Sequence, residues 1–352
     1  MSKYLFIRML RAVDHAVFCV AEGQKTYWNP TSRTKQAYSS GQQVKRSFIN
    51  ALLDELDEVY APVTITQVLK TSSGKRTLGD GEPLSAIDPH FVDQLIGGWM
   101  RAQAGKQTIK RRSPLSISAM RPIHPYLSSL AEESITFDRT GTSGDHKVIV
   151  RDEKGVPVSD ETLQEFLQSS GESLRLRTFM PSEKVGYRAT GLFVTDFAID
   201  LSRLFSIGLN PYDLEIEQNM VTQLQDEGWI KNGNSIICPD KRRGQIITAL
   251  AKSLISWRIT SNQSRTYSPQ ETIAISIGTN ASLVSASIRG ELDEEGERKA
   301  NVVIDRDMEG DNLRLFVSPS ARGFIQGIHA ESDALLKAEK HIKEKLTKYP
   351  YE

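Results

Sequence analysis

Residues 38–56 read YSSGQQVKRSFINALLDEL, and this stretch decides the interpretation of the chain. Its apolar residues recur at every fourth position, a spacing that places them on one face of a helix: Val44, Phe48, Leu52 and Leu56. We expect Ser40 or Gly41 to begin the helix, because small polar residues are favoured at helix N-termini. Lys45 and Arg46 lie off the apolar stripe and are therefore expected away from the core.

The segments around this helix alternate between strand and helix patterns. Strands are expected at residues 4–10, 16–20 (a second strand or a continuation of the first), 114–123, 191–201 and 271–277. Further helices are expected at residues 89–104, 243–257 and 333–346. The order strand, helix, inserted strands, helix, strand predicts an α+β fold whose ferredoxin-like or RRM-like core is enlarged by insertions.

Four stretches depart from this core pattern. Residues 22–41 form a polar, basic loop with Trp28, and it is too long for an ordinary connection. Residues 62–112 are irregular and contain glycine-rich turns. Residues 135–158 alternate and are broken by glycines, which predicts a protruding β-hairpin. The acidic run 291–297 is expected to be a loop.

The composition is that of a globular protein. The 352 residues include 44 Lys and Arg and 44 Asp and Glu, with 39% hydrophobic residues, which excludes collagen-like, coiled-coil and disordered chains. We expect no signal peptide and no membrane span, because no apolar run approaches the roughly 20 residues that a bilayer requires. Cys19 and Cys238 lie far apart, so neither a disulfide framework nor a zinc site is expected, and a reducing cytosol fits best.

Basic residues gather in three stretches that contain no acid. Residues 23–53 carry five of them, residues 94–131 carry six and residues 241–270 carry six. On one face of the molecule they would bind phosphate groups, with an affinity that falls as salt rises. The alternative is a solvated surface scattered around the fold, since the sequence does not place the three stretches together. A third possibility is that the rest of the chain, which is acidic, forms a face that binds the basic face of a neighbouring copy.

Three short motifs resemble one known family. Residues 38–46, YSSGQQVKR, look like the ISSQSLKR signature that opens the first palm helix in the crRNA-binding backbone subunit of type I CRISPR Cascade complexes, the Cas-seven family of the RAMP superfamily. Residues 189–201, ATGLFV to IDL, are similar to the family's SSGVF to INL strand, and residues 262–267, NQSRTY, resemble its KQRT loop. Three matches in the correct order are a stronger indication than one short motif.

The resemblance implies a right-hand architecture. It divides the chain into a first palm part (1–59), a fingers insertion (60–112), a palm strand (113–126), a thumb insertion bearing the β-hairpin (127–187), and a second palm part with the C-terminal helix (188–352). The fingers and the thumb are assigned by position only, because no family motif falls within them.

The resemblance also implies a function in antiviral defence. Such a subunit polymerises along the crRNA as a helical ribonucleoprotein filament, while its thumb flips one nucleotide out of the stack at regular intervals. The guide bases between remain available for pairing with target DNA, so base pairing reads the sequence and the protein supplies shape and charge. The partners it implies are the crRNA, the target DNA strand, further copies of the chain and other Cascade subunits. No cofactor, metal or membrane is expected.

The RNA-binding residues that the resemblance implies come from four places. Ser39, Ser40, Gly41 and Gln42 stand at a helix N-terminus, where free N–H groups favour phosphate, although a plain N-cap would use the same residues. Lys45 and Arg46 follow one turn later. The remaining candidates are Arg33 and Lys35 in the long loop, Arg121 after the palm strand, and Asn262, Gln263 and Arg265 in the later loop. A solvated surface or internal ion pairs are the alternatives for these charged residues.

Catalysis is the less favoured interpretation. The backbone subunits of type III complexes cut RNA with an aspartate in the loop before the first helix, yet residues 23–53 contain neither Asp nor Glu. The nearest acids, Asp14 and Glu22, lie outside the matched segment. A RAMP-superfamily endoribonuclease would need a general acid and base, and the six histidines form no recognisable pair. We therefore expect a binding and scaffolding protein with no catalytic residues.

Overall fold

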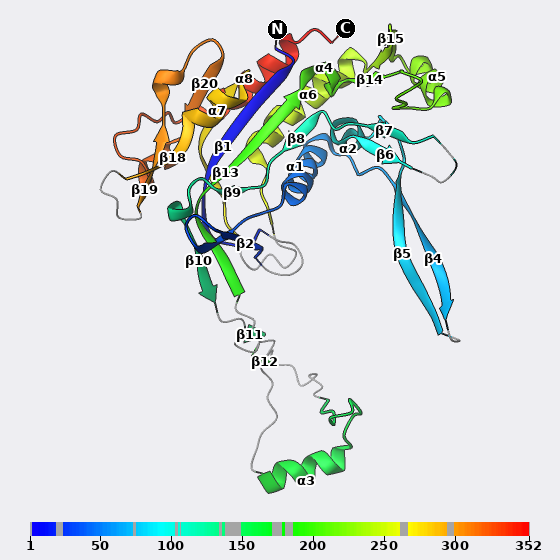
Figure 1. Ribbon diagram of the computed structural model, residues 1–352, viewed down its shortest axis with the longest axis vertical. Coiled ribbons are helices and arrows are strands. Elements are labelled where there is room, and N and C mark those ends of the chain that lie inside the picture. Colours follow the sequence, from blue (N-terminus) through cyan, green and yellow to red (C-terminus); the bar gives the residue numbers. More distant parts are fainter. Residues whose placement is uncertain are drawn as a thin grey trace. The chain divides into compact units, whose positions relative to one another are not determined.

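The computed structural model describes residues 2–18, 24–72, 75–102, 105, 107–133, 136–137, 149–170, 178–179, 186–260, 267–293 and 299–351. The chain divides into two compact units (Figure 1). One unit comprises Met1–Leu130 with Ala189–Glu352, and the other is Ala131–Arg188, which overlaps the predicted insertion 127–187. Helices and sheets are both present, as the α+β prediction requires.

A central sheet organises the larger unit. Its strands run in the order β10 (Ser128–Glu133), β13 (Gly186–Asp200), β1 (Tyr4–Ala16), β17 (Glu271–Gly278) and β20 (Leu313–Val317). The short strands β8 (Leu115–Ile117) and β9 (Arg121–Pro122) also pair with β13. The two neighbours of β1 are both antiparallel to it. Of the strand considered at 16–20, only Ala16 belongs to β1; residues 17–18 lie outside any strand, and 19–20 lie outside the described residues.

Both faces of this sheet are covered. The alternating residues Leu5, Ile7 and Met9 of β1 belong to a core shared with helices α1 (Gly41–Leu56), α6 (Asp240–Ser256) and α8 (Ala334–Lys348). Leu10 points to the opposite face, into a second core formed with α7 (Ala281–Ser287), β18 (Ile288–Leu292) and β19 (Ala300–Ile304). Because side chains alternate along a strand, one apolar strand serves two cores.

The first helix has the predicted form. α1 begins at Gly41, and the Ser40 hydroxyl accepts a hydrogen bond from the Gln43 N–H at 3.3 Å. The predicted apolar stripe faces the core, with Val44, Phe48 and Leu52 fully buried. The predicted helices at 243–257 and 333–346 are likewise confirmed as α6 and α8.

The region 62–112 differs from its prediction. It opens with a two-stranded ribbon of β4 (Val63–Ser72) and β5 (Lys75–Ser85). The helix expected at 89–104 is wrong in length, since α2 covers only Val92–Gly97 and is followed by the hairpin of β6 (Trp99–Arg101) and β7 (Ile109–Arg111). Gly98 ends the helix with a φ of +76°, and a Cβ there would lie 2.7 Å from the backbone nitrogen of Ser113.

Two further segments differ from their predictions: one predicted loop contains a hairpin, and one predicted strand is divided into two. The long loop 22–41 contains a hairpin of β2 (Thr26–Asn29) and β3 (Thr34–Ala37). The strand expected at 114–123 is divided into β8 and β9. Met120, between them, exchanges backbone hydrogen bonds with Ser39. The segment therefore pairs with β13 and also holds the residues that precede α1.

The smaller unit contains α3 (Asp160–Ser170) and a short pair of strands, β11 (Thr136–Phe137) with β12 (Thr178–Phe179). The hairpin predicted within 135–158 is therefore wrong in its pairing, because the partner of β11 lies more than 40 residues further along the chain. Within 149–158 the described residues make one isolated bridge, Arg151 with Pro157. The remainder of that predicted hairpin, residues 138–148, lies outside the described residues.

The connections of the larger unit carry the remaining elements. Between β13 and α6 lie α4 (Leu201–Leu204), α5 (Gln218–Asp226) and a small sheet of β14 (Ser206–Gly208), β16 (Ser235–Ile237) and β15 (Ile230–Asn232). The start of the acidic run 291–297, expected to be a loop, belongs to strand β18, and residues 294–298 lie outside the described part. Among the helices described, none combines the length and apolar character that crossing a membrane requires.

Gly191 is predicted to be the glycine on which β13 depends. Its φ is +128°, and a Cβ would lie 2.5 Å from the Cα of Ser128. Gly191→Ala should therefore lower the free energy of unfolding by about 1–3 kcal/mol from backbone strain, and by more from the clash. Gly244→Ala in α6 is the control, because a Cβ at that position would meet nothing within 4 Å and alanine is the better helix former. Urea unfolding of both variants tests this, and equal stabilities would contradict it.

Candidate nucleic-acid interface

The first two motif regions, and the residue that directly follows the third, meet at the end of β1. Backbone groups of residues 14–18 contact a hydroxyl group from each of these three places. The bonds join the Phe18 carbonyl to the Ser39 hydroxyl (3.2 Å), the His15 N–H to the Thr190 hydroxyl (3.1 Å), and the Asp14 N–H to the Ser268 hydroxyl (3.4 Å). Ser39 and Thr190 lie within the first two motifs, and Ser268 directly follows the third. Segments more than 200 residues apart in sequence are thereby brought to one place.

The N-terminus of α1 offers free hydrogen-bond donors at this place. Its first turn contains no acidic residue. Gly41 allows close packing, since a Cβ there would lie 3.1 Å from the Ile117 carbonyl oxygen. Gln42 and Arg46 are exposed one turn apart, and neither side chain contacts another described residue through a hydrogen bond or ion pair. N–H groups, helix dipole and guanidinium together favour an anion here.

Two of the predicted site residues have structural contacts instead. Ser39 is fully buried, and its hydroxyl is used in the bond to Phe18. The Lys45 ammonium donates to the Gly97 carbonyl at 3.0 Å and to the Ser113 hydroxyl at 2.8 Å. Burial lowers the pKa of Lys45. The side chain of Lys45 therefore connects α1 to α2 and to the start of β8, and its ammonium points away from solvent.

The β2–β3 hairpin presents the two loop candidates. Arg33 stands in its turn with a φ of +56°, held by the hydrogen bond from its N–H to the Asn29 carbonyl. Lys35 follows in β3, and both side chains are exposed. The hairpin is fixed to the larger unit through Gln36, whose side-chain oxygen accepts from the Ser128 hydroxyl at 2.7 Å. Trp28 is 59% exposed on β2, so its ring is available to stack on a base.

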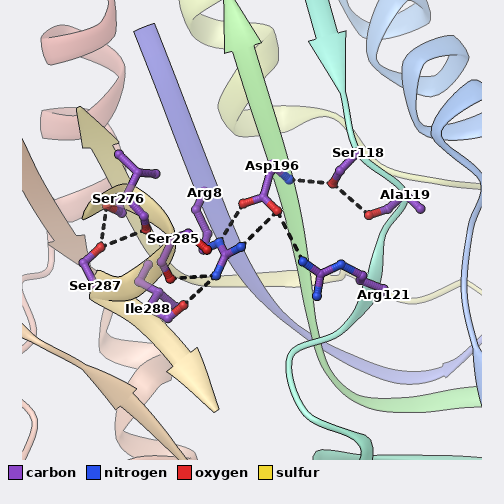
Figure 2. A network of polar contacts seen from close by, with 10 residues as sticks. Arg8, Ser118, Ala119, Arg121, Asp196, Ser276, Ser285, Ser287 and Ile288 are labelled. Carbon is purple, nitrogen blue, oxygen red and sulfur yellow. Dashed lines mark hydrogen bonds and ion pairs between the residues drawn. The ribbon is translucent and has the colours of Figure 1, made fainter. Parts of the chain in front are cut away.

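Arg121 belongs to a network of polar contacts on the sheet (Figure 2). Arg8 donates two hydrogen bonds to the Asp196 carboxylate, at 2.6 and 3.1 Å, and two more to the carbonyls of Ser285 and Ile288. The Arg121 guanidinium lies 3.7 Å from the same carboxylate. Arg121 thus interacts with a carboxylate that already accepts hydrogen bonds from Arg8, and the Arg121 side chain is about half exposed.

Sequence reasoning missed Arg11, which is fully buried. Its guanidinium lies 3.9 Å above the Trp257 ring and donates to the Trp257 carbonyl, while its Nε and Nη2 groups have no hydrogen-bond partner among the described residues. Burial, and then the charge of Arg258, lower the pKa of Arg11 well below its ordinary value. Burial also lowers the pKa of Arg258. No described carboxylate pairs with either residue, so a bound anion would stabilise both. The sequence feature that could have identified Arg11 is the presence of an arginine next to an apolar strand pattern.

Most other described cations of the second and third basic stretches are paired. In all but one pair, Arg243–Asp240, the acid comes from a distant segment, which the sequence pattern cannot reveal. The pairs are Arg101–Glu217, Lys110–Asp213, Arg111–Glu215, Arg121–Asp196, Arg242–Glu58, Arg243–Asp240 and Lys252–Glu55. These residues therefore form internal ion pairs, the alternative to a basic face.

The last three predicted site residues, Asn262, Gln263 and Arg265, lie outside the described residues. The chain on either side of them is held together by Gln270. Its buried side chain accepts from the Ile259 N–H at 3.2 Å and donates to the Ile259 carbonyl at 2.6 Å. Two bonds between one side chain and one backbone unit fix the two ends of this loop near the end of β1.

Within the described part of the chain, no three His, Cys, Asp or Glu side chains are grouped so as to hold a metal ion. His124 accepts a hydrogen bond from the Tyr126 N–H at 3.3 Å. The candidate interface contains hydroxyl, amide and guanidinium groups, which are hydrogen-bond donors that phosphate oxygens can accept from.

No protein-family model matches the chain, and no curated protein sequence matches it. Among solved structures it is similar to a chain of a "CRISPR RNA-guided surveillance complex, pre-nicking", with a TM-score of 0.43 and 9% identity over 97% of this chain and 88% of that chain. A chain of a "CRISPR RNA-guided surveillance complex" gives a TM-score of 0.38 and 9% identity over 99% and 85%. TM-scores this low do not establish a common fold, so function is argued from the residues and contacts of the chain itself.

Charge reversal at the two neighbouring cations of α1 should affect different properties: stability for Lys45 and RNA affinity for Arg46. Lys45→Glu should lower the free energy of unfolding by about 1.5–3 kcal/mol, because it removes two hydrogen bonds from a charged donor. Arg46→Glu should change stability by at most about 0.5 kcal/mol, yet weaken the binding of a 30-nucleotide RNA. Urea unfolding and fluorescence anisotropy measure the two effects. A stable Lys45→Glu protein, or unchanged RNA affinity in Arg46→Glu, would contradict the assignment.

Proposed function

We propose that the chain is the non-catalytic backbone subunit of an RNA-guided CRISPR surveillance complex. In this role it polymerises along the crRNA, holds the phosphate backbone and presents guide bases for pairing with target DNA. The observation that carries the proposal is that the first two motif regions, and Ser268 directly after the third, all contact residues 14–18 of the chain. The sequence matches alone required only an order along the chain, whereas a single binding site requires proximity.

The strand order supports an RRM-like palm within this proposal. Read across the sheet, the order is β17, β1, β13 and β8, with antiparallel neighbours, and α1 and α6 share one core against it. Along the chain these elements occur as β1, α1, β8, β13, α6 and β17. This is the pattern of two interleaved β-α-β units. Residues 60–112 would then serve as fingers and 127–187 as the thumb.

RNA phosphate groups would be bound at two places. Exposed Arg46 and the α1 N-terminus would bind one phosphate group, with Gln42 beside it. Arg258 would bind another, since its own charge and that of Arg11 lack a carboxylate in the described residues. A phosphate beside Arg258 would offset the repulsion between the two guanidinium groups, which stabilises the complex relative to the free protein.

The direct test is to purify the protein from its native operon context and to sequence the nucleic acid that accompanies it. RNAs of uniform length with repeat-derived ends are expected, and they should dissociate as salt is raised because phosphate contacts release counterions. Arg46→Glu should retain less RNA than the unaltered protein. RNA that is absent, or random in sequence, would overturn the proposal.

A ribonuclease of the same superfamily is the second candidate. The observation that favours it is the presence of Asp14 and His15 at the convergence point, with the Thr190 hydroxyl 3.5 Å from an Asp14 carboxylate oxygen. Both are groups that general acid–base catalysis uses. If this candidate is correct, the purified protein should shorten bound RNA on incubation, and His15→Ala should stop the cleavage. Intact RNA after prolonged incubation would exclude it.

A further inference from the structure

Four polar side chains gather at the outer edge of the central sheet, where α8 packs beside the edge strand β20 (Figure 1). His341, Lys345 and Lys348 share one face of α8, because residues three and four positions apart are neighbours on a helix. The Phe316 ring of β20 contacts the His341 imidazole, with 5.7 Å between the ring centroids. Arg314 stands two residues before Phe316 and therefore lies on the same side of β20. We call Arg314, His341, Lys345 and Lys348 the β20–α8 cluster.

The chain does not neutralise the three cations of this cluster. Within the part of the chain that the structure describes, the side chains of Arg314, Lys345 and Lys348 make no ion pair and no hydrogen bond. Arg314 and Lys348 are exposed, and Lys345 is partly exposed. The acids of α8 are Glu344, which pairs with none of the three, and Glu339, which lies toward α6. The cluster thus keeps a positive charge even when Glu344 is counted.

The environment of His341 indicates the same positive charge. Burial lowers the pKa of His341, and the charges of Lys345, Arg314 and Lys348 lower it further, while Glu344 acts in the opposite direction. Acids before β20 and α8 do not act on the imidazole: Glu309 pairs with Arg306, Glu331 and Asp333 pair with Lys337, and Asp311 is exposed in the turn before β20. An anion bound beside these cations would therefore favour the charged form of the imidazole.

Positive charge near a helix C-terminus can also stabilise the helix alone. Lys345 and Lys348 occupy the last turn of α8, where cations interact favourably with the helix dipole. This explanation does not cover Arg314, which belongs to a strand and adds its charge at the same imidazole. Three cations around one imidazole suit a compact group with more than one negative charge. A phosphate monoester carries about −1.5 to −2 at neutral pH and three acceptor oxygens, which exceeds the single charge of a carboxylate.

The β20–α8 cluster is separate from the candidate nucleic-acid interface. Arg314 pairs with Ile277, which in turn pairs with Ile7 near the start of β1. The interface lies at residues 14–18, at the other end of that strand. The seven residues from Ile7 to Asp14 span roughly 23 Å at about 3.3 Å per residue. One phosphate group cannot contact both places, so the cluster would bind a different group from the one at the α1 N-terminus.

We infer that the β20–α8 cluster binds a phosphate monoester, carried either by a free nucleotide or by the end of a nucleic-acid strand. Arg314 and the two lysines would donate to the phosphate oxygens. His341 would add a further donor, because the bound phosphate favours the imidazolium. The inference does not rest on the proposed function, since it uses neither the motif regions nor the binding of a guide strand.

The test uses the full chain and probes that differ in their terminal phosphate. They are AMP, inorganic phosphate, and a 12-nucleotide RNA with a phosphate at its 5′ end, at its 3′ end or at neither. AMP, or one of the phosphorylated RNAs relative to the unphosphorylated RNA, should bind at least about five-fold more tightly than to Lys345→Glu with Lys348→Glu, because charged hydrogen bonds are lost. Arg314→Gln should weaken the same probe. Fluorescence anisotropy with RNA, and competition by AMP, measure these affinities.

The imidazole of His341 gives a second measurement at the site itself. Its NMR signal is identified by its loss in His341→Asn, and it should titrate at a higher pH when the bound probe is present. A charge effect elsewhere on the surface would not move this titration, since the groups that act on His341 all belong to β20 and α8.

Lys340→Glu with Lys343→Glu is the matched control. Both lysines are exposed on α8, make no ion pair within the described residues, and lie on a different face of the helix from Lys345 and Lys348. The change in charge is the same, yet the affinity for the phosphate probes should stay within two-fold of that of the unaltered protein. Urea unfolding checks that both double variants are folded. Arg314→Gln leaves α8 unchanged and tests the site if the helix variant unfolds.

Each outcome decides for or against the inference. Equal competition by AMP and phosphorylated RNA supports a site for free nucleotides, and a preference for one phosphorylated RNA supports a site for that strand end. Phosphate probes that neither shift the His341 titration nor lose affinity in the site variants overturn the inference, and so does an equal loss in the control variant. Displacement of the probe by a polyglutamate peptide of equal affinity would make the cluster a surface for an acidic protein and would also overturn it.

Discussion

The structure depends on the burial of β1 on both faces between β13 and β17. One face of this strand completes the core beneath α1, α6 and α8, and the other completes the core beneath α7 and the β18–β19 hairpin. Its two arginines follow the same division. Arg8 is satisfied by Asp196 and two carbonyls on one face (Figure 2), whereas Arg11 lies under Trp257 on the other with two groups unsatisfied. The end of this strand is where the first two motif regions meet the residue that follows the third.

Charge is used in two different ways. Six cations of the second and third basic stretches form ion pairs with acids from distant segments, and these contacts tie α6 to α1 and the β6–β7 hairpin to the region around α5. Other cations of the chain lack an ion pair among the described residues, Arg46 and the Arg11–Arg258 pair among them. Because the net charge is zero, binding of an anion cannot rest on overall attraction and must rest on these local groups.

The sequence by itself determined the local elements with strong periodicity. α1 with its Ser40 cap, α6, α8, β13 and β17 were predictable because each carries its apolar pattern within one continuous segment. The Ser40 cap and the exposure of Gln42 and Arg46 were also predictable, because they depend only on where the helix starts and on which face is apolar.

Only the tertiary structure decided the features that join distant segments. The pairing of β11 with β12, the contacts of the Lys45 ammonium, the burial of Arg11 and the acids opposite the basic stretches all involve residues far apart in sequence. A local pattern reports on which side of an element a residue lies, but not on what packs against that side. Proximity across the fold, set by the burial of β1, therefore separates the cations that hold the protein together from those available to bind nucleic acid.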